Sequence, residues 1–172
     1  MIIGVGGVSR SGKTSLAFLI KKILEEHGET AIVLSQDDFV FDENQIPKIR
    51  HRTDWECPES IDFQRYKKEI IEKKGQFQHV ITEGLLNFWN DELDALFDRR
   101  LFCCIKKDIF LNRRLQEKRW GLEPKWFIEH VWKSYLKYGQ TILFEPKNGV
   151  LLVSGVEEFD VDLIRAFLGF QI

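Results

Sequence analysis

The amino-acid sequence predicts a three-layer α/β fold, in which helices cover both faces of a five-stranded, mostly parallel sheet. Short apolar runs alternate with longer segments whose apolar residues recur at helical spacing, and turn residues separate the two. The chain has 172 residues, of which 44% are hydrophobic and 30% charged, a composition that suits one domain with a full core. We therefore expect residues 1–172 to form a single domain with right-handed crossovers between parallel strands.

The first elements follow from apolar patterning. Residues 1–5 form the first expected strand, and a helix follows that ends before Gly28. The apolar residues at helical spacing in this helix are Leu16, Leu19, Ile20, Ile23 and Leu24. Residues 30–35 predict a second buried strand. Residues 40–57 are polar and predict a long loop, a type of segment that is usually functional or disordered in compact domains.

Strands and helices continue to alternate after the loop. The expected elements are a helix over 58–75, a strand over 79–84, a short helix over 91–98, a strand over 101–106, a basic helix over 108–120, an aromatic-rich helix over 124–144, a strand over 150–153 and a helix over 161–170. Ligands in parallel sheets bind at the carboxyl ends of the strands. The strand ends before Gly7, Asp37 and Glu83 are therefore expected to converge on one crevice.

A phosphate-binding pattern follows the first strand. Residues 7–14 read Gly-Val-Ser-Arg-Ser-Gly-Lys-Thr and match G-x-x-x-x-G-K-[ST]. Glycines let successive backbone N–H groups point at phosphate oxygens, and the following helix directs its positive end at the same anion. Lys13 would reach the β- and γ-phosphates, while the Thr14 hydroxyl would hold Mg²⁺. The expected phosphate-binding residues are Gly7, Ser9, Arg10, Ser11, Gly12, Lys13, Thr14 and Ser15.

Carboxylates at two strand ends suit phosphoryl transfer to an acceptor. Asp37 follows the second strand and is the expected base for the acceptor's proton. The alternative is that Asp37 and Asp38 only cap the strand. Glu83 ends a buried strand, where its charge is costly without a cation, so we expect it to contact Mg²⁺ directly or through water. The alternative is a pair with a lysine.

A basic cluster predicts a lid over the nucleotide at about residues 108–122. Its cations are Arg113, Arg114, Lys118 and Arg119, which would stabilise the transferred charge. We assign Arg114 to catalysis and Arg119 to ATP binding. The alternative is a solvated helix face.

An acceptor site is expected in and near the long loop. The Asp54 carboxylate is placed to accept hydrogen bonds from a pair of sugar hydroxyls. Trp55 and Trp120 are candidates for stacking on a heteroaromatic ring, with cation–π attraction if the ring is charged. The alternative is that either tryptophan belongs to the core.

Charge and composition exclude several classes of protein. The formal charge of −2 and pI near 6.1 indicate no broad basic surface, so nucleic acid is not an expected partner. No apolar stretch is long enough to cross a bilayer, and we expect a cytoplasmic protein without a membrane partner, as a monomer or a homodimer. Cys57, Cys103 and Cys104 have neither disulfide-framework nor metal-ligand spacing.

Four runs of sequence together resemble the nicotinamide riboside kinases. They are residues 3–16, residues 34–39 (Leu-Ser-Gln-Asp-Asp-Phe), residues 81–84 (Ile-Thr-Glu-Gly) and residues 130–138, which begin His-Val-Trp. These kinases are grouped with uridine kinases and phosphoribulokinase among the P-loop kinases, whose Walker A motif is the phosphate pattern described above. The resemblance extends from the first strand to about Gln140.

The resemblance implies roles for individual residues. Asp37 would be the catalytic carboxylate, Glu83 the magnesium-associated acid and Asp54 a ribose-hydroxyl ligand. Trp120 falls near a family aromatic that sandwiches the nicotinamide.

The chain also departs from the family pattern at two places. Thr53 stands where a second stacking aromatic is expected, and Trp55 is placed to substitute for it. Leu115 lies near the position of a lid arginine that touches the ribose, a role that Arg114 or Arg119 would take over.

These observations predict an ATP- and Mg²⁺-dependent kinase that phosphorylates the primary hydroxyl of a ribosyl compound. Nicotinamide riboside is the first expected substrate, with a role in NAD biosynthesis, and uridine or another nucleoside or metabolite is the alternative. A different class remains open, namely a GTPase-like switch or a non-catalytic nucleotide-binding module. The chain contains no Asn-Lys-x-Asp guanine-reading motif to support a GTPase.

Overall fold

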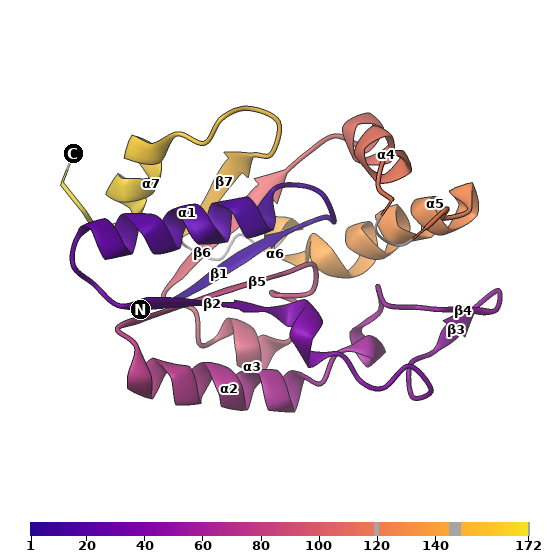
Figure 1. Ribbon diagram of the computed structural model, residues 1–172, viewed down its shortest axis with the longest axis horizontal. Helices are drawn as coiled ribbons and strands as arrows, with labels where there is room; N and C mark the ends of the chain where they lie inside the picture. Colours follow the sequence, from indigo (N-terminus) through magenta and orange to yellow (C-terminus); the bar gives the residue numbers. More distant parts are fainter. Residues whose placement is uncertain (119–120, 145–148, 172) are drawn as a thin grey trace.

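The computed structural model describes residues 1–118, 121–144 and 149–171. Its central sheet has five strands in the order β2-β5-β1-β6-β7, and every pairing in it is parallel (Figure 1). The strands are β1 (Ile2–Gly7), β2 (Ala31–Ser35), β5 (His79–Gly84), β6 (Arg99–Cys104) and β7 (Val150–Ser154). The predicted α/β class and the five-stranded parallel sheet are confirmed.

Helices cover both faces of the sheet, as Figure 1 shows. On one face, α1 (Lys13–Glu26) and α7 (Val161–Leu168) pack on strand residues such as Ile3 and Leu101. The opposite face packs against α2 (Phe63–Gln76), α3 (Asp91–Asp94) and the helices between β6 and β7. Side chains of consecutive strand residues alternate between the two cores, which is why the strands read as continuous apolar runs.

Residues 124–144 do not form the single long helix that the sequence predicts. They form α5 (Lys125–Ser134), a π-helical turn (Tyr135–Gly139) and α6 (Thr141–Phe144). A Cβ on Gly139 would lie 3.1 Å from the Leu85 carbonyl oxygen, so the backbone of this turn lies close to the loop after β5. Helical periodicity continues through such a turn, which is why the sequence pattern did not reveal the break.

Other element bounds also shift. The basic helix expected over 108–120 is α4 (Lys107–Leu115), and the short helix expected over 91–98 ends at Asp94. A 3-10 helix (Pro58–Ser60) precedes α2, which begins after the cap Asp62, whose carboxylate accepts from the Arg65 N–H at 3.0 Å. The predicted loop over 40–57 contains the antiparallel hairpin β3 (Lys48–Ile49) and β4 (Arg52–Thr53).

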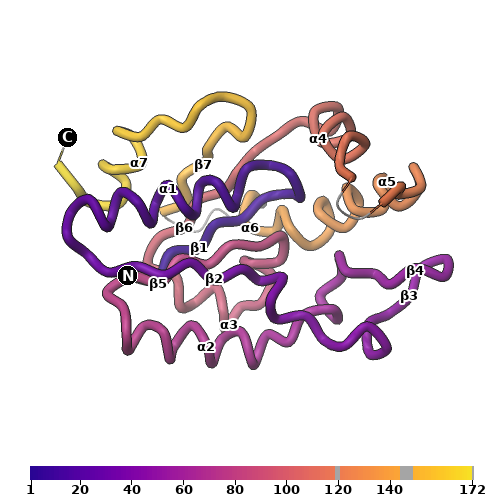
Figure 2. The backbone as a smooth tube through the Cα atoms, viewed as in Figure 1, coloured from indigo at the N-terminus to yellow at the C-terminus, as the bar shows by residue number. Residues whose placement is uncertain are grey.

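The hairpin, α4 and α5 gather at the end of the molecule where β1, β2 and β5 finish (Figure 2). These segments are far apart in the sequence, yet together they surround the carboxyl edge of the sheet. Among the described residues, no helix combines the length and apolar character that crossing a bilayer requires.

Candidate active site

The phosphate loop connects β1 to α1 in a conformation that needs glycine. Gly7 has φ 140° and Gly12 has φ 99°, and a Cβ on Gly7 would lie 2.6 Å from the Cys103 carbonyl oxygen. Lys13 donates to the Val8 carbonyl oxygen at 3.1 Å, so its side chain folds back over the loop. Helix α1 begins without a side-chain cap or an acidic residue in its first turn. Its first N–H groups therefore suit an anion.

The remaining residues of the loop divide into buried and exposed positions. Ser11 is fully buried beneath the loop, Ser9 is half-buried, and Arg10, Thr14 and Ser15 are exposed. Arg10 has φ 65°, in the left-handed region that non-glycine residues rarely adopt.

Glu83 occupies a hydroxyl-lined position at the end of β5. Its side chain is largely buried, and its Oε1 accepts hydrogen bonds from Thr14 Oγ1 and Ser35 Oγ, both at 3.1 Å. No lysine or arginine in the described ranges pairs with it, so the lysine-pair alternative does not hold there. Carboxylate and hydroxyl oxygens are hard ligands of the kind that Mg²⁺ prefers, and the residues present therefore fit this ion.

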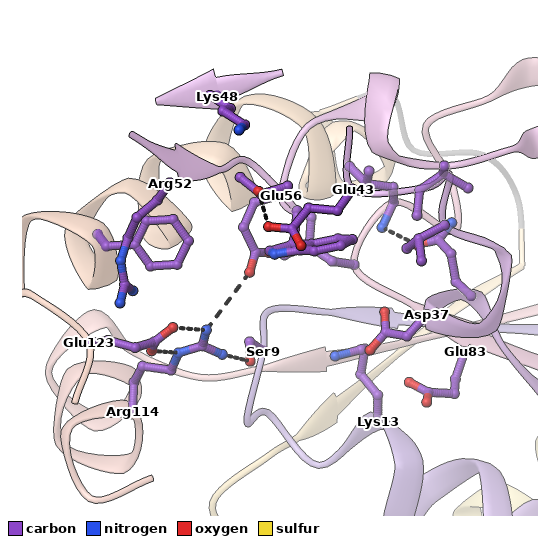
Figure 3. Close-up of a pocket in the computed structure, with 18 of the residues that line it drawn as sticks. Ser9, Lys13, Asp37, Glu43, Lys48, Arg52, Glu56, Glu83, Arg114 and Glu123 are labelled. Atoms are coloured by element: carbon purple, nitrogen blue, oxygen red, sulfur yellow. Dashed lines mark hydrogen bonds and ion pairs between the residues drawn. The ribbon is translucent and has the colours of Figure 1, made fainter. Parts of the chain in front are cut away.

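Asp37 lies in a 3-10 helix (Gln36–Phe39) that directly follows β2. The helix is held in place by buried Gln36, whose Oε1 accepts from the Leu86 N–H at 2.9 Å, and by Arg65, which donates to the Asp38 carbonyl oxygen at 2.8 Å. Asp37 itself is exposed, and Figure 3 shows its carboxylate facing the Lys13 amine. These two contacts hold the backbone of the 3-10 helix in place, while the Asp37 carboxylate beside the phosphate loop stays exposed.

A cavity of about 690 Å³ opens between the phosphate loop, the 40–57 segment and the lid. The predicted site residues that line it are Ser9, Lys13, Asp37, Trp55, Glu83 and Arg114. Further lining residues that carry polar or aromatic groups are Gln36, Glu43, Lys48, His51, Arg52, Thr53, Glu56, Glu123 and Phe127. The structure therefore brings Ser9 and Lys13 of the phosphate loop, the expected base Asp37 and the expected metal-associated Glu83 to one cavity.

Asp54 does not line this cavity. Its Oδ1 accepts from His130 Nε2 at 2.8 Å and from the Glu56 N–H at 3.2 Å. Trp55, next in the chain, does line the cavity and is 41% exposed, so it is not a core residue. Arg119 and Trp120, to which we assigned ATP and substrate contacts, lie outside the described residues.

Arg114, in the segment predicted to form a lid, is buried and is not part of a solvated helix face. Its Nε and one terminal nitrogen donate to the two oxygens of Glu123 at 2.6 and 2.9 Å, and its other terminal nitrogen donates to Ser9 Oγ at 2.7 Å. A Glu56 oxygen lies 4.0 Å from it (Figure 3). Arg114 thus connects the lid to the phosphate loop.

Arg113 and Glu117, close to Arg114 in the chain, also contact the phosphate loop. Arg113 donates to the Arg10 and Gly155 carbonyl oxygens at 2.9 and 2.8 Å, and Arg10 pairs with Glu117 at 2.9 Å. Lys118 is exposed.

Three acidic residues of the cavity were not expected from the sequence. Glu43 accepts from the Thr53 hydroxyl at 2.7 Å, Glu123 holds Arg114, and Glu56 faces Arg114. Burial raises the pKa of Glu56 to about 7; the Arg114 guanidinium opposes this rise and the Asp37 carboxylate adds to it. Glu43 and Glu56 lie in the polar loop that the sequence marked, whereas no local pattern connects Glu123 with Arg114.

The cysteines are structural. Cys103 is fully buried in β6, and burial raises the pKa of its thiol to about 12. Burial also raises the pKa of Cys57 to about 11 and that of Cys104. Thiols that ionise so reluctantly are poor nucleophiles and metal ligands.

Comparison with known proteins agrees with this geometry. Over 156 residues the chain is 30% identical to nicotinamide riboside kinase 1 of Homo sapiens, covering 81% of this chain and 76% of that protein. It is 23% identical to nicotinamide riboside kinase of Eremothecium gossypii, covering 78% and 74%, and 30% identical to uridine kinase of Chlamydia pneumoniae, covering 67% and 62%. No protein-family model matches the chain.

Solved structures support the same fold. The fold matches that of a possible uridine kinase from Bacillus stearothermophilus with a TM-score of 0.56 at 16% identity, covering 88% of each chain. It matches a sugar kinase from Janibacter sp. HTCC2649 with a TM-score of 0.65 at 18% identity, covering 97% of this chain and 93% of that one. The fold and the phosphate loop thus define a P-loop kinase.

The chain belongs to the nicotinamide riboside kinase and uridine kinase-like family. It is accordingly a phosphotransferase that acts on a hydroxyl group, and the switch or non-catalytic class is set aside.

Proposed function

We propose that this enzyme transfers the γ-phosphate of ATP to the primary hydroxyl of a ribosyl compound, with nicotinamide riboside as the first candidate. The observation that carries the proposal is the cavity, in which Lys13 and Asp37 face each other beside the phosphate loop, and which Trp55 and Phe127 also line. Its volume of about 690 Å³ suits a small ligand.

The nucleotide would bind at the phosphate loop and the start of α1. Backbone N–H groups there and the Lys13 amine bind the phosphates, and Arg114 and Arg119 contribute charge from the lid. Thr14 and Glu83 would hold Mg²⁺, which bridges phosphate oxygens and neutralises developing charge when bound.

Asp37 would accept the proton of the attacking hydroxyl. It lines the cavity, lies on a 3-10 helix and faces Lys13, so a hydroxyl placed between them is close to the phosphate site. General-base assistance of this kind contributes about 10²–10⁴-fold to a rate.

The acceptor's base would lie toward the hairpin. Nicotinamide riboside carries a cationic ring, for which Trp55 and Trp120 are the proposed stacking partners. A second candidate is a neutral nucleoside such as uridine, because Lys48 and Arg52 line the cavity from the hairpin and would repel a cationic ring. Arg52 also lies over Phe127, 5.4 Å from the ring centroid.

A substrate panel tests the proposal. The protein is incubated with ATP, Mg²⁺ and, separately, nicotinamide riboside, uridine, cytidine, adenosine, pantothenate or ribulose 5-phosphate, and ADP and phosphorylated product are measured. Nicotinamide mononucleotide as the dominant product supports the first candidate and a place in NAD biosynthesis. Phosphorylated uridine or cytidine as the dominant product favours the second candidate. Transfer to none of the ribosyl compounds overturns the proposal.

A further inference from the structure

The Arg114–Glu123 ion pair lies in the wall of the cavity. Both side chains line the cavity, and they are 5% and 8% exposed. Two hydrogen bonds, of 2.6 and 2.9 Å, join Nε and Nη2 of Arg114 to the two oxygens of Glu123 (Figure 3). Two parallel bonds of this kind fix the plane of a guanidinium group, which a single bond does not. Glu123 therefore determines the direction in which the guanidinium points.

The opposite edge of the Arg114 guanidinium faces the phosphate loop. Its Nη1 donates to the Ser9 hydroxyl at 2.7 Å, and Ser9 belongs to the loop over residues 7–14. A charged phosphate oxygen is a stronger acceptor than a hydroxyl oxygen. A phosphate bound in this loop would thus meet the edge of the guanidinium that lies away from Glu123.

Packing on α5 holds the backbones that carry this pair. Helix α4 packs on α5 through Phe110 and Trp132, whose ring centroids are 5.3 Å apart. Glu123 directly precedes Pro124, whose ring restricts the backbone and whose carbonyl oxygen accepts from the Phe127 N–H at 2.8 Å. The guanidinium is therefore oriented before any ligand binds. Preorganised charge of this kind is what stabilises a transition state most effectively.

We propose that Glu123 is a positioning residue for phosphoryl transfer. It holds the Arg114 guanidinium against the phosphate loop, where that charge stabilises the transferred phosphoryl group. This inference rests on the proposed function, since it concerns the same transfer from ATP. Because Glu123 acts through Arg114 on charge that develops in the transition state, its loss is expected to lower kcat more than it changes either KM.

A second arginine–carboxylate pair provides a matched control. Arg100 on β6 donates from Nε to Asp94 Oδ1 at 2.9 Å, and the two side chains are 12% and 3% exposed. Neither residue lines the cavity. Breaking a buried pair of this kind leaves a cation without its carboxylate and lowers stability. Asp94→Asn therefore reproduces the structural cost of Glu123→Gln without disturbing the cavity.

A double-mutant cycle tests the inference. Glu123→Gln, Arg114→Lys, the double variant and Asp94→Asn are assayed with the best acceptor of the panel, and kcat and both KM values are measured. We expect Glu123→Gln to lower kcat by about 10- to 100-fold. Arg114→Lys, which keeps the charge but loses the two-bond geometry, is expected to lower kcat by about 10²–10³-fold.

The double variant separates positioning from structural support. If Glu123 acts through Arg114, adding Glu123→Gln to Arg114→Lys lowers kcat no further. Asp94→Asn is expected to be less stable than the wild type with unchanged kcat. Thermal melting of each variant verifies folding. Where Glu123→Gln is unfolded at the assay temperature, Glu123→Asp replaces it, with a smaller loss of kcat expected because the carboxylate is kept on a shorter side chain.

Four results would overturn the inference. They are a wild-type kcat in folded Glu123→Gln, an increase in its kcat, which would mean that the pair restrains Arg114, an equal loss of kcat in folded Asp94→Asn, and losses that multiply in the double variant.

The substrate panel separates failure of this inference from failure of the proposed function. If a ribosyl compound is phosphorylated and Glu123→Gln matches the wild type, this inference fails alone. If only pantothenate or ribulose 5-phosphate is phosphorylated, the proposed function fails, and the same variants test this inference with that acceptor. If no compound is phosphorylated, both fail.

Discussion

The replacement Glu56→Gln tests how the buried Glu56 carboxyl group affects the stability of the protein. The amide has nearly the same shape as the carboxyl group but does not ionise. In the folded protein the pKa of Glu56 is about 7, compared with 4.5 for the unperturbed side chain, and burial is the main cause. The unfolded chain therefore loses this proton at a lower pH than the folded chain does.

The sign and size of the effect follow from this difference. Between pH 4.5 and 7 the folded state binds more protons than the unfolded state, so the free energy of unfolding decreases as the pH rises through this window. The full shift corresponds to a ceiling of about 3 kcal/mol. Solvent access to the cavity makes the actual effect of the Glu56 charge on stability smaller than this ceiling. We therefore expect Glu56→Gln to be more stable than the wild type by about 1–3 kcal/mol at pH 8, and we expect no such gain near pH 4.5.

Denaturation in the absence of ligands measures this difference in the free energy of unfolding. Urea unfolding at pH 5 and pH 8, followed by tryptophan fluorescence, gives the free energy of unfolding of the wild type, Glu56→Gln and the control Glu59→Gln, at an exposed position that does not line the cavity. A gain that is equal at both pH values would refute the reasoning, as would a variant that is less stable than the wild type at pH 8. Thermal melting gives a second reading, at about 2–4 °C per kcal/mol for a chain of this size.

Three other replacements give separate tests. Asp37→Asn is expected to lower kcat by about 10²–10⁴-fold with unchanged ATP binding, because only the proton acceptor is lost; turnover near the wild-type level would assign this role to another group. Gly155→Ala places a methyl group against the Ser11 carbonyl oxygen, so it is expected to displace the phosphate loop, weaken ATP binding measured by titration and lower stability by about 1–3 kcal/mol; wild-type ATP affinity would contradict this. Arg52→Gln removes a cation from the acceptor end and is expected to raise kcat/KM for nicotinamide riboside relative to uridine; an unchanged ratio would show that the hairpin charge does not select the base.

Local patterns were sufficient for most of the fold. Strand and helix periods placed the sheet and its covering helices, because an apolar repeat is a property of neighbouring residues. The phosphate loop was equally visible, since its glycines and Lys13 must be adjacent in the chain to surround an anion. The break of the helix over 124–144 was missed, because a π-helical turn leaves the apolar repeat almost unchanged and depends on packing against the loop after β5.

The site was predictable only in part. Asp37 and Glu83 were found because they end strands, and parallel strands in one sheet end at a common edge. The Arg114 partner Glu123 was not found, because the two residues are nine positions apart in the chain and no spacing rule connects them.

By itself, the sequence determined the α/β class, the phosphate loop and the carboxylates at the strand ends, since each is encoded within a few consecutive residues. The tertiary structure decided which loop carboxylate faces the cavity. Asp54 turns toward His130, and Glu56 turns toward the cavity. The physical reason is that side chains in an irregular loop have no fixed period, so their directions depend on the helix against which the loop packs.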